Sequence, residues 1–198
     1  MQRTIWMGVI MVLAGILLVW GVAFARPYQL NGSELENVPA PAIVLERDNG
    51  TTYQLTDSLG RITLLFFGYT YCPDVCPATL ADMKRVKAEV GQAADQVDFV
   101  FITVDPQRDT PQRAQSYVNG FDSAFIGLSG SEEDLEPVWA GYWIYRMIQE
   151  GQTAAGYLVD HSARVYLVDK SGNLRVTYAF GTPAEEIAAD VRYLLREK

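Results

Sequence analysis

The first 26 residues contain the longest apolar run of the chain. Residues 4–25 carry no charged side chain, and at about 1.5 Å per residue they reach about 33 Å, enough to cross the hydrocarbon core of a bilayer. Because the apolar core of a cleaved secretory signal is only about 7–15 residues long, the pattern favours a retained membrane anchor in residues 1–26. Cleavage after Ala25 stays open, since Ala23-Phe24-Ala25 has the small-x-small form of a cleavage site.

The pattern of polar and apolar positions changes after this anchor. Residues 27–40 are mostly polar and predict a tether between the membrane and a folded domain. Residues 42–46 and 51–55 are short runs on either side of Asn49-Gly50, and Asn-Gly between two such runs is a strong signal for a β-hairpin. An N-terminal hairpin is therefore expected at the start of the domain.

The rest of the chain alternates between continuous apolar runs, which predict buried strands, and apolar positions at helical spacing. The expected strands cover residues 62–67, 97–104, 124–128, 164–169 and 174–180. The expected helices cover residues 77–90 and 111–120, a segment from Ser131 through Trp139 toward Arg146, and a closing segment that begins at Thr182. Three of these helices have recognisable start signals, which are Thr110 before Pro111, the acidic turn Glu132-Glu133-Asp134, and a capping box in Thr182-Pro183-Ala184-Glu185.

This order of elements indicates the fold class. Strand–helix–strand–helix, followed by a hairpin and a last helix, is the layout of an α/β, thioredoxin-like fold. The expected architecture is a thioredoxin-like domain over residues 41–198 with an added N-terminal β-hairpin, preceded by one transmembrane helix. In that layout the loop between the first core strand and its helix is the functional loop.

Cysteine and histidine are rare in this chain, and their positions indicate the candidate chemistry. Cys72 and Cys76 are the only cysteines, and His161 is the only histidine. The cysteines follow the apolar run 62–68 and the histidine precedes the run 164–168, so all three lie at the ends of expected core strands. Two thiolates and one imidazole suit copper, either as Cu(I) or as Cu(II).

Other interpretations of these residues stay open. Structural zinc takes four closed ligands, so Asp74 or Asp160 would have to complete a tetrahedron. Outside the cytoplasm a cysteine pair is often a structural disulfide, and a lone histidine is more often an ordinary core or surface residue. Because residues before proline avoid helical angles, Cys76 is expected to cap a helix that begins at Pro77, where the helix dipole would lower the pKa of its thiol.

The charge balance bears on location and partners. A single N-terminal span with no second apolar stretch behaves like an uncleaved signal, which would place the domain outside the cytoplasm, at the periplasmic or outer face of the cell membrane. Without Arg3 and Arg26 the 16 Lys and Arg fall to 14, against 24 Asp and Glu, so the exported part has a net charge of −10. Such an acidic surface repels nucleic acid, and no nucleic-acid partner is expected.

Three segments resemble the Sco/SenC family, in the order in which that family has them. They are Leu65-Phe66-Phe67-Gly68-Tyr69-Thr70-Tyr71-Cys72-Pro73-Asp74-Val75-Cys76-Pro77, then Thr103-Val104-Asp105-Pro106-Gln107-Arg108-Asp109-Thr110-Pro111, and then Val159-Asp160-His161-Ser162. The resemblance covers roughly residues 40–198 and implies a membrane-anchored copper chaperone with a thioredoxin fold, which helps to assemble the copper A centre of cytochrome c oxidase.

The resemblance also implies site residues and partners. By resemblance Cys72, Cys76 and His161 are the copper ligands. The implied partners are the copper A subunit of cytochrome c oxidase, an upstream copper donor and a thiol reductant. Tyr71 stands where the family often has histidine, which leaves its role open. The segment from Asp105 to Thr110 matches a family signature, although a capped loop between a strand and a helix is a sufficient physical account of it.

The alternative class is an enzyme, either a thiol–disulfide oxidoreductase or a peroxiredoxin-like peroxidase, which would use the same cysteines. Thioredoxin-type redox motifs have two residues between the cysteines, whereas Cys72 and Cys76 are separated by three. Thioredoxin-fold oxidoreductases also resemble one another in a cis-proline that faces the cysteines, and this chain has no proline between Pro137 and Pro183. The facing segment carries His161 instead, so a metallochaperone is the favoured interpretation.

Overall fold

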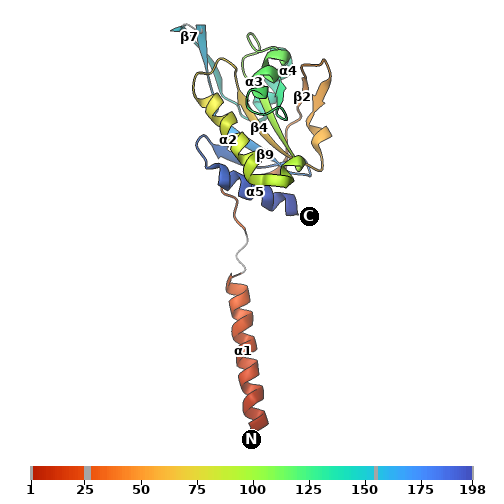
Figure 1. The fold of residues 1–198 in the computed structure, drawn as a ribbon, viewed down its shortest axis with the longest axis vertical. Coiled ribbons are helices and arrows are strands. Elements are labelled where there is room, and N and C mark those ends of the chain that lie inside the picture. Colours follow the sequence, from red (N-terminus) through yellow and green to blue (C-terminus); the bar gives the residue numbers. More distant parts are fainter. Residues whose placement is uncertain (1, 25–27, 154–155, 198) are drawn as a thin grey trace.

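The computed structural model describes residues 2–24, 28–153 and 156–197 (Figure 1). Helix α1 (Gln2–Phe24) covers most of the segment for which the sequence predicts an anchor. It lies outside the α/β domain (Figure 1), and those of its apolar side chains that the structure describes, such as Met11 and Leu17, are exposed. Within the described ranges, no helix combines the length and the hydropathy that a membrane span requires.

The domain is built on a six-stranded mixed sheet with the strand order β1-β10-β9-β4-β5-β6. In chain order these strands are β1 (Ser33–Pro39), β4 (Ile62–Gly68), β5 (Val97–Thr103), β6 (Ile126–Leu128), β9 (Arg164–Val168) and β10 (Asn173–Ala179). Strands β4, β5 and β6 are parallel, and β9, β10 and β1 add to the other edge as antiparallel neighbours. All seven residues of β4 are buried, as expected of a central strand that is covered on both faces.

Helices and a small hairpin cover the two faces of this sheet. The helices are α2 (Val75–Val90), α3 (Pro111–Asn119), α4 (Glu132–Gly141) and α5 (Ala184–Arg196), with short 3-10 turns at Leu55–Ser58 and Gly91–Gln96. Phe66 contacts Phe101, which in turn contacts Tyr117 of α3. The next residue of β4, Phe67, points to the opposite face, where it contacts Tyr142 at the end of α4. The alternation of β4 thus places α3 and α4 on opposite faces.

Two hairpins among the described residues lie outside the main sheet. The N-terminal hairpin of β2 (Val44–Glu46) and β3 (Thr52–Gln54) confirms the hairpin predicted from Asn49-Gly50. The second hairpin, β7 (Arg146–Thr153) with β8 (Gly156–His161), was not predicted, because its apolar stretches are short and no Asn-Gly signal marks its turn. It projects at the top of the domain in Figure 1 and carries the single histidine.

The structure corrects the prediction of a tether over residues 27–40. Part of this segment, β1, is an edge strand that pairs antiparallel with β10. Ahead of it, Tyr28 stacks on Tyr193 of α5 at 4.2 Å, and its hydroxyl donates to Asp190 Oδ1 at 2.6 Å. Backbone pairing at a sheet edge does not require apolar side chains, so the polar sequence of β1 concealed it.

Three predicted helix boundaries were wrong. Helix α2 begins at Val75, two residues before Pro77, because a proline in the first turn lacks only an N–H that would have no helical partner there. Helix α4 ends at Gly141, and Trp143 then adopts a left-handed φ of 53° as the chain turns into β7. The capping box at Thr182 does not form, since the Thr182 hydroxyl donates to Ala179 O and α5 begins after Pro183.

Candidate metal centre

The structure brings the three candidate ligands together. Cys72 lies in the loop between β4 and α2, Cys76 is the second residue of α2, and His161 is the last residue of β8. Their ligand atoms all lie within 4.8 Å of one another, and Cys76 Sγ is 3.5 Å from His161 Nε2. Both cysteines are free thiols, Cys72 half-buried and Cys76 fully buried. His161 is therefore brought next to Cys76, which lies 85 positions earlier in the sequence, and next to Cys72.

The histidine ring is held in an orientation suited to metal binding. Its Nδ1 is 3.1 Å from the carbonyl oxygen of Ser162. Because a carbonyl only accepts hydrogen bonds, Nδ1 carries the proton and the lone pair is left on Nε2, which faces the sulfurs. Phe66 and Tyr69 approach the ring edge-on, at 6.3 and 5.8 Å between centroids. The ring is thus fixed on two sides, with its free nitrogen toward the cysteines.

The pKa values of the two thiols are shifted in opposite directions. The pKa of Cys72 lies well below its ordinary value because the Cys76 thiol donates a hydrogen bond to it, and the backbone N–H groups of Asp74 and Cys76 stabilise its thiolate further. The N–H of Cys76, at the start of α2, is 3.4 Å from Cys72 Sγ. The same hydrogen bond, together with burial, raises the pKa of Cys76. The pair therefore shares one negative charge, centred on Cys72.

This result corrects the prediction that Cys76 caps its helix and has the lowered pKa. Asp74 occupies the N-cap position, and Cys76 lies inside the first turn, where its side chain points into the core. The free N–H groups of the helix start are directed at Cys72 instead. The helix N-terminus does stabilise a thiolate, as expected on general grounds, but it is the thiolate of the preceding cysteine.

The site opens to solvent on one side. A hollow of about 220 Å³ lies over Cys72 and His161, and its walls include Pro73, Leu158 and Ala163. Asp160, an alternative fourth ligand, is exposed and accepts a hydrogen bond from Gln149 Nε2 at 2.8 Å. Asp160 also lines this hollow, but its carboxylate is not part of the cluster formed by Cys72, Cys76 and His161. Among the described residues, Cys72, Cys76 and His161 form the only cluster of three or more Cys, His, Asp or Glu side chains that could hold a metal ion. Structural zinc takes a closed set of four ligands, and these residues do not form one.

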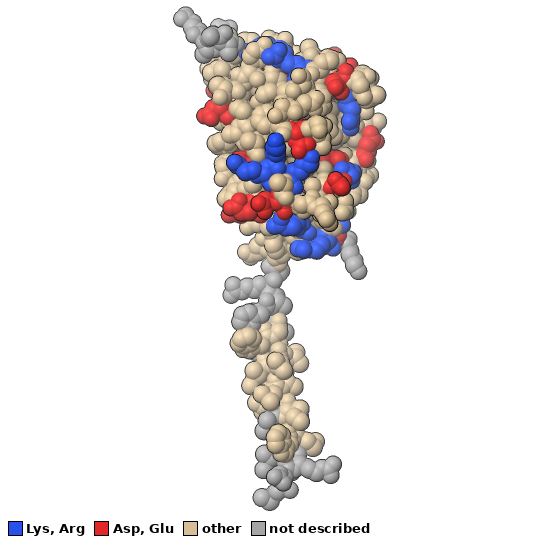
Figure 2. Space-filling view, viewed as in Figure 1, with Lys and Arg blue, Asp and Glu red and all other residues tan. Residues whose placement is uncertain are grey.

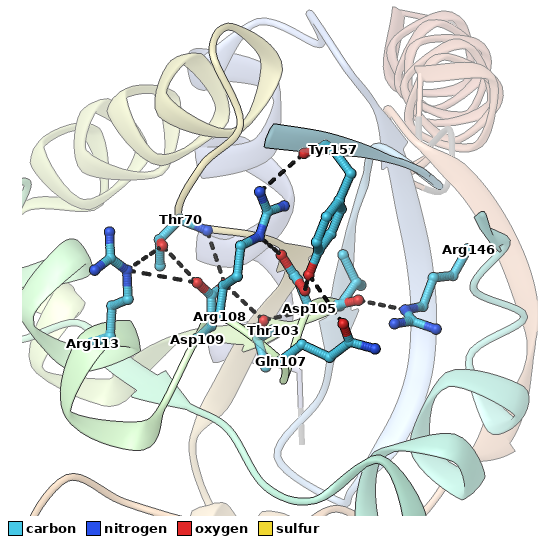
Figure 3. A network of polar contacts seen from close by, with 10 residues as sticks. Thr70, Thr103, Asp105, Gln107, Arg108, Asp109, Arg113, Arg146 and Tyr157 are labelled. Atoms are coloured by element: carbon cyan, nitrogen blue, oxygen red, sulfur yellow. Dashed lines mark hydrogen bonds and ion pairs between the residues drawn. The ribbon is translucent and has the colours of Figure 1, made fainter. Parts of the chain in front are cut away.

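A buried polar network lies beside the cysteine loop, and sequence reasoning did not assign it a role (Figure 3). Asp109 is fully buried, and burial raises its pKa. Its Oδ2 accepts from the backbone N–H of Thr70 at 2.9 Å and from the Thr103 hydroxyl at 2.8 Å, while Oδ1 accepts from the Thr70 hydroxyl at 2.6 Å. These bonds fix the start of the cysteine loop. The signal for them was present in the segment Asp105–Thr110, which the sequence explained only as a capped loop.

Tyr69 was also missed. It is buried, its hydroxyl is hydrogen-bonded to Cys72, and burial raises its pKa to about 12. Because its ring edge also faces His161, this tyrosine contacts both halves of the candidate site. Its position next to Gly68, at the end of the central strand β4, is the only sequence signal that could have indicated this role.

Comparisons with known proteins agree with this arrangement. The SCO1/SenC family model matches residues 41–196. A putative copper-binding protein of Stutzerimonas stutzeri is 35% identical over 136 residues, which are 68% of this chain and 66% of that protein. An SCO2-like protein of Rickettsia prowazekii is 33% identical over 140 residues, or 70% of this chain and 68% of the relative.

Solved structures show the same fold. The copper-bound ScoI of Bradyrhizobium japonicum is 35% identical, with a TM-score of 0.72 over 80% of this chain and 99% of that one. The apo Sco1 of Thermus thermophilus is 32% identical, with a TM-score of 0.76 over 86% of this chain and 100% of that one. The thioredoxin-like α/β fold predicted from the order of elements is thereby confirmed. On the match of its family model, its relatives and its fold, this chain belongs to the SCO1/SenC family.

Proposed function

We propose that this protein binds one copper ion through Cys72 Sγ, Cys76 Sγ and His161 Nε2. The observation that carries the proposal is the convergence of these atoms to within 4.8 Å of one another from two separate segments of the chain. Thiolates are soft ligands that select Cu(I), and imidazole binds copper in either oxidation state. Cys72 is already ionised at neutral pH, so binding requires the loss of one proton, that of Cys76.

The role in the cell is the delivery of copper to the copper A site of cytochrome c oxidase. Support comes from the family and from relatives whose names describe copper, such as the copper-bound ScoI of Bradyrhizobium japonicum. The site also has the geometry of a donor, because three protein ligands and an open hollow leave room for a ligand of the receiving protein. The copper A subunit is then the acceptor, an upstream protein loads the copper, and a thiol reductant keeps the cysteines reduced.

Copper titration of the reduced full-length chain in detergent tests this proposal. We expect one copper per chain, measured by metal analysis and by competition with a chelator. Cys72→Ser, Cys76→Ser and His161→Ala should each weaken binding at least about a hundredfold, because each removes one of three ligands. Asp160→Asn is the matched control and should bind like the unaltered chain, since that carboxylate is bonded to Gln149. Full affinity in His161→Ala would contradict the three-ligand site.

Thiol–disulfide exchange with an oxidase subunit is the second candidate function. The pairing of a half-buried thiolate on Cys72 with a buried thiol on Cys76 is the arrangement that favours it, because exchange needs one attacking thiolate and one resolving thiol. The two functions share the same residues. A chain that bound no copper but reduced insulin disulfides as fast as a thioredoxin would be an enzyme, and the copper proposal would have to be abandoned.

The N-terminal helix is proposed to hold the domain at the membrane, with the domain outside the cytoplasm. The described side chains of α1 are uncharged (Figure 2), and large apolar ones such as Trp6, Met11 and Leu17 are exposed. Exposed apolar surface on this scale marks a contact with lipid or with another protein. We expect the full chain in the membrane fraction after a high-salt wash and a chain that starts at Pro27 in the soluble fraction. Recovery of both in the soluble fraction would contradict an anchor.

A further inference from the structure

The proposed copper site consists of two parts that no strand pairing joins. The cysteines belong to the loop and helix that follow β4, inside the main sheet. His161 belongs to the β7–β8 hairpin, which forms a sheet of its own. The distance between Cys76 and His161 therefore depends on the side-chain contacts that hold this hairpin against the cysteine loop.

On the hairpin side, Arg108 contacts Tyr157 of β8 (Figure 3). Its Nη1 donates to the carbonyl oxygen of Tyr157 at 2.9 Å, and its guanidinium carbon lies 3.7 Å from the centre of the Tyr157 ring. The Tyr157 hydroxyl donates to Asp105 Oδ1 at 2.6 Å, and Arg108 Nε donates to Oδ2 of the same carboxylate at 2.5 Å. Tyr157 is on β8, four residues before His161, so these bonds act on the strand that carries the histidine.

On the cysteine side, the same guanidinium lies over Tyr71, the residue just before Cys72. The distance from the guanidinium carbon of Arg108 to the ring centre is 4.6 Å, and Arg113 lies 4.3 Å from the centre of the same ring. Arg108 is also 5.8 Å from the ring centre of Tyr69, whose edge faces His161. Guanidinium groups are attracted to aromatic faces at these distances, and more strongly when water is excluded. The side chain of Arg108 is only 15% exposed.

We propose that Arg108 is a positioning residue that joins the two halves of the copper site, through Tyr157 on the histidine side and Tyr71 on the cysteine side. This inference rests on the proposed copper function and adds residues to it that bind no metal. It also gives Tyr71 a role, since a tyrosine ring at this position provides the face on which Arg108 packs. The fully buried carboxylate of Asp105 fixes the orientation of the guanidinium.

The position of His161 depends on Arg108, whereas the positions of the two cysteines do not. Cys72, in the loop before α2, is only four residues from Cys76 in the first turn of that helix, so their convergence does not need Arg108. His161 comes from the hairpin, so its contribution to copper affinity depends on how well the hairpin is held in place before the metal arrives. Loss of Arg108 should therefore weaken the histidine contribution and spare the thiolates.

A double-mutant cycle on the full-length chain tests this dependence. Arg108→Met keeps the length and the apolar stem of the side chain while it removes the charge and the donors. We expect it to lower the affinity for copper about tenfold in the unaltered chain, the lower end of the range for residues that orient a ligand. In a chain that already carries His161→Ala, the same substitution should change the affinity by less than about twofold. Arg113→Met is the control, because Arg113 contacts Tyr71, Thr70 and Asp109, which all lie outside the hairpin.

The outcomes separate the inference from the proposed function. Three outcomes would overturn the role of Arg108 while the copper site stands. They are an equal loss of copper affinity on Arg108→Met in the unaltered and His161→Ala chains, no loss in either chain, or an equal loss on Arg113→Met. If the unaltered chain binds no copper, the proposed function fails, and amide hydrogen exchange of the metal-free chain still tests the inference. Arg108→Met should then speed exchange in β8 relative to α2, and unchanged exchange would overturn it. Tyr157→Phe removes one hydroxyl only, and it should act in the same direction and to a smaller extent.

Discussion

Cys72 and Cys76 differ in environment although they are four residues apart. Cys72 is half-buried and receives hydrogen bonds from the Cys76 thiol and from N–H groups at the start of α2. Cys76 is fully buried among core side chains. A thiolate is stabilised by donors and by partial exposure to water, whereas burial favours the neutral thiol. The reactive sulfur of the reduced, metal-free protein is therefore that of Cys72.

Alkylation of the metal-free, reduced chain with iodoacetamide checks this difference. We expect Cys72 to be modified first, at a rate that is nearly constant between about pH 5 and pH 8, because its pKa of about 3 lies below this range and the thiolate is already fully formed. In Cys72→Ser the buried Cys76 should react slowly, and its rate should rise with pH. Peptide mass spectrometry distinguishes the two sites. Preferential labelling of Cys76 would contradict the assignment.

At the scale of secondary-structure elements, the core was predictable from the sequence and the surface hairpin was not. Strands β4 and β5 are mostly apolar, and α3 has Thr110 as its N-cap with Pro111 at its first position, as predicted. Hydrophobic burial and capping are local signals, so they are visible in the sequence. Hairpin β7–β8 is held by polar contacts with distant residues, such as the bond from Arg146 Nε to Val104 O. Such contacts leave no periodic pattern.

The ligand residues of the candidate site were predictable from the sequence, but their pKa shifts and the contacts that position them were not. Two cysteines and one histidine at strand ends indicated a metal site, and the structure brings them together. The sequence assigned the lowered pKa to the wrong cysteine, because the proline after Cys76 suggested a later helix start. The contacts of Arg108 with Tyr71 and Tyr157 join segments 37 and 49 residues away from it, and no single sequence shows such pairings.

At the scale of the whole molecule, the sheet explains where the site forms. Strands β4 and β5 are parallel neighbours, and Gly68 at the end of one pairs with Thr103 at the end of the other. The loops that follow these ends lie side by side, as is usual at the carboxyl edge of a parallel sheet. One loop carries the cysteines and the other carries Asp105, Arg108 and Asp109. The β7–β8 hairpin lies at this edge of the sheet and carries His161.

The location proposed for the domain makes its copper affinity dependent on redox state. A compartment outside the cytoplasm is oxidising, and a bond between Cys72 and Cys76 would convert both thiol ligands into a disulfide, which is a poor donor for copper. His161 would then be left almost alone. We expect the oxidised chain to lose nearly all affinity for copper and reduction to restore it, with sulfur-to-copper charge-transfer absorption when Cu(II) is added to the reduced chain.

Copper binding by the oxidised and reduced full-length chain, measured under matched conditions, provides the test. Cys72→Ser and Cys76→Ser are the controls, because neither forms the internal disulfide, so their weak binding should not respond to the oxidant, and neither should show the charge-transfer band of the unaltered chain. A reductase that keeps the thiols open would then be required for function in such a compartment. Equal binding by the oxidised and reduced chains would show that the sulfurs are not ligands, and the proposed copper site would have to be rejected.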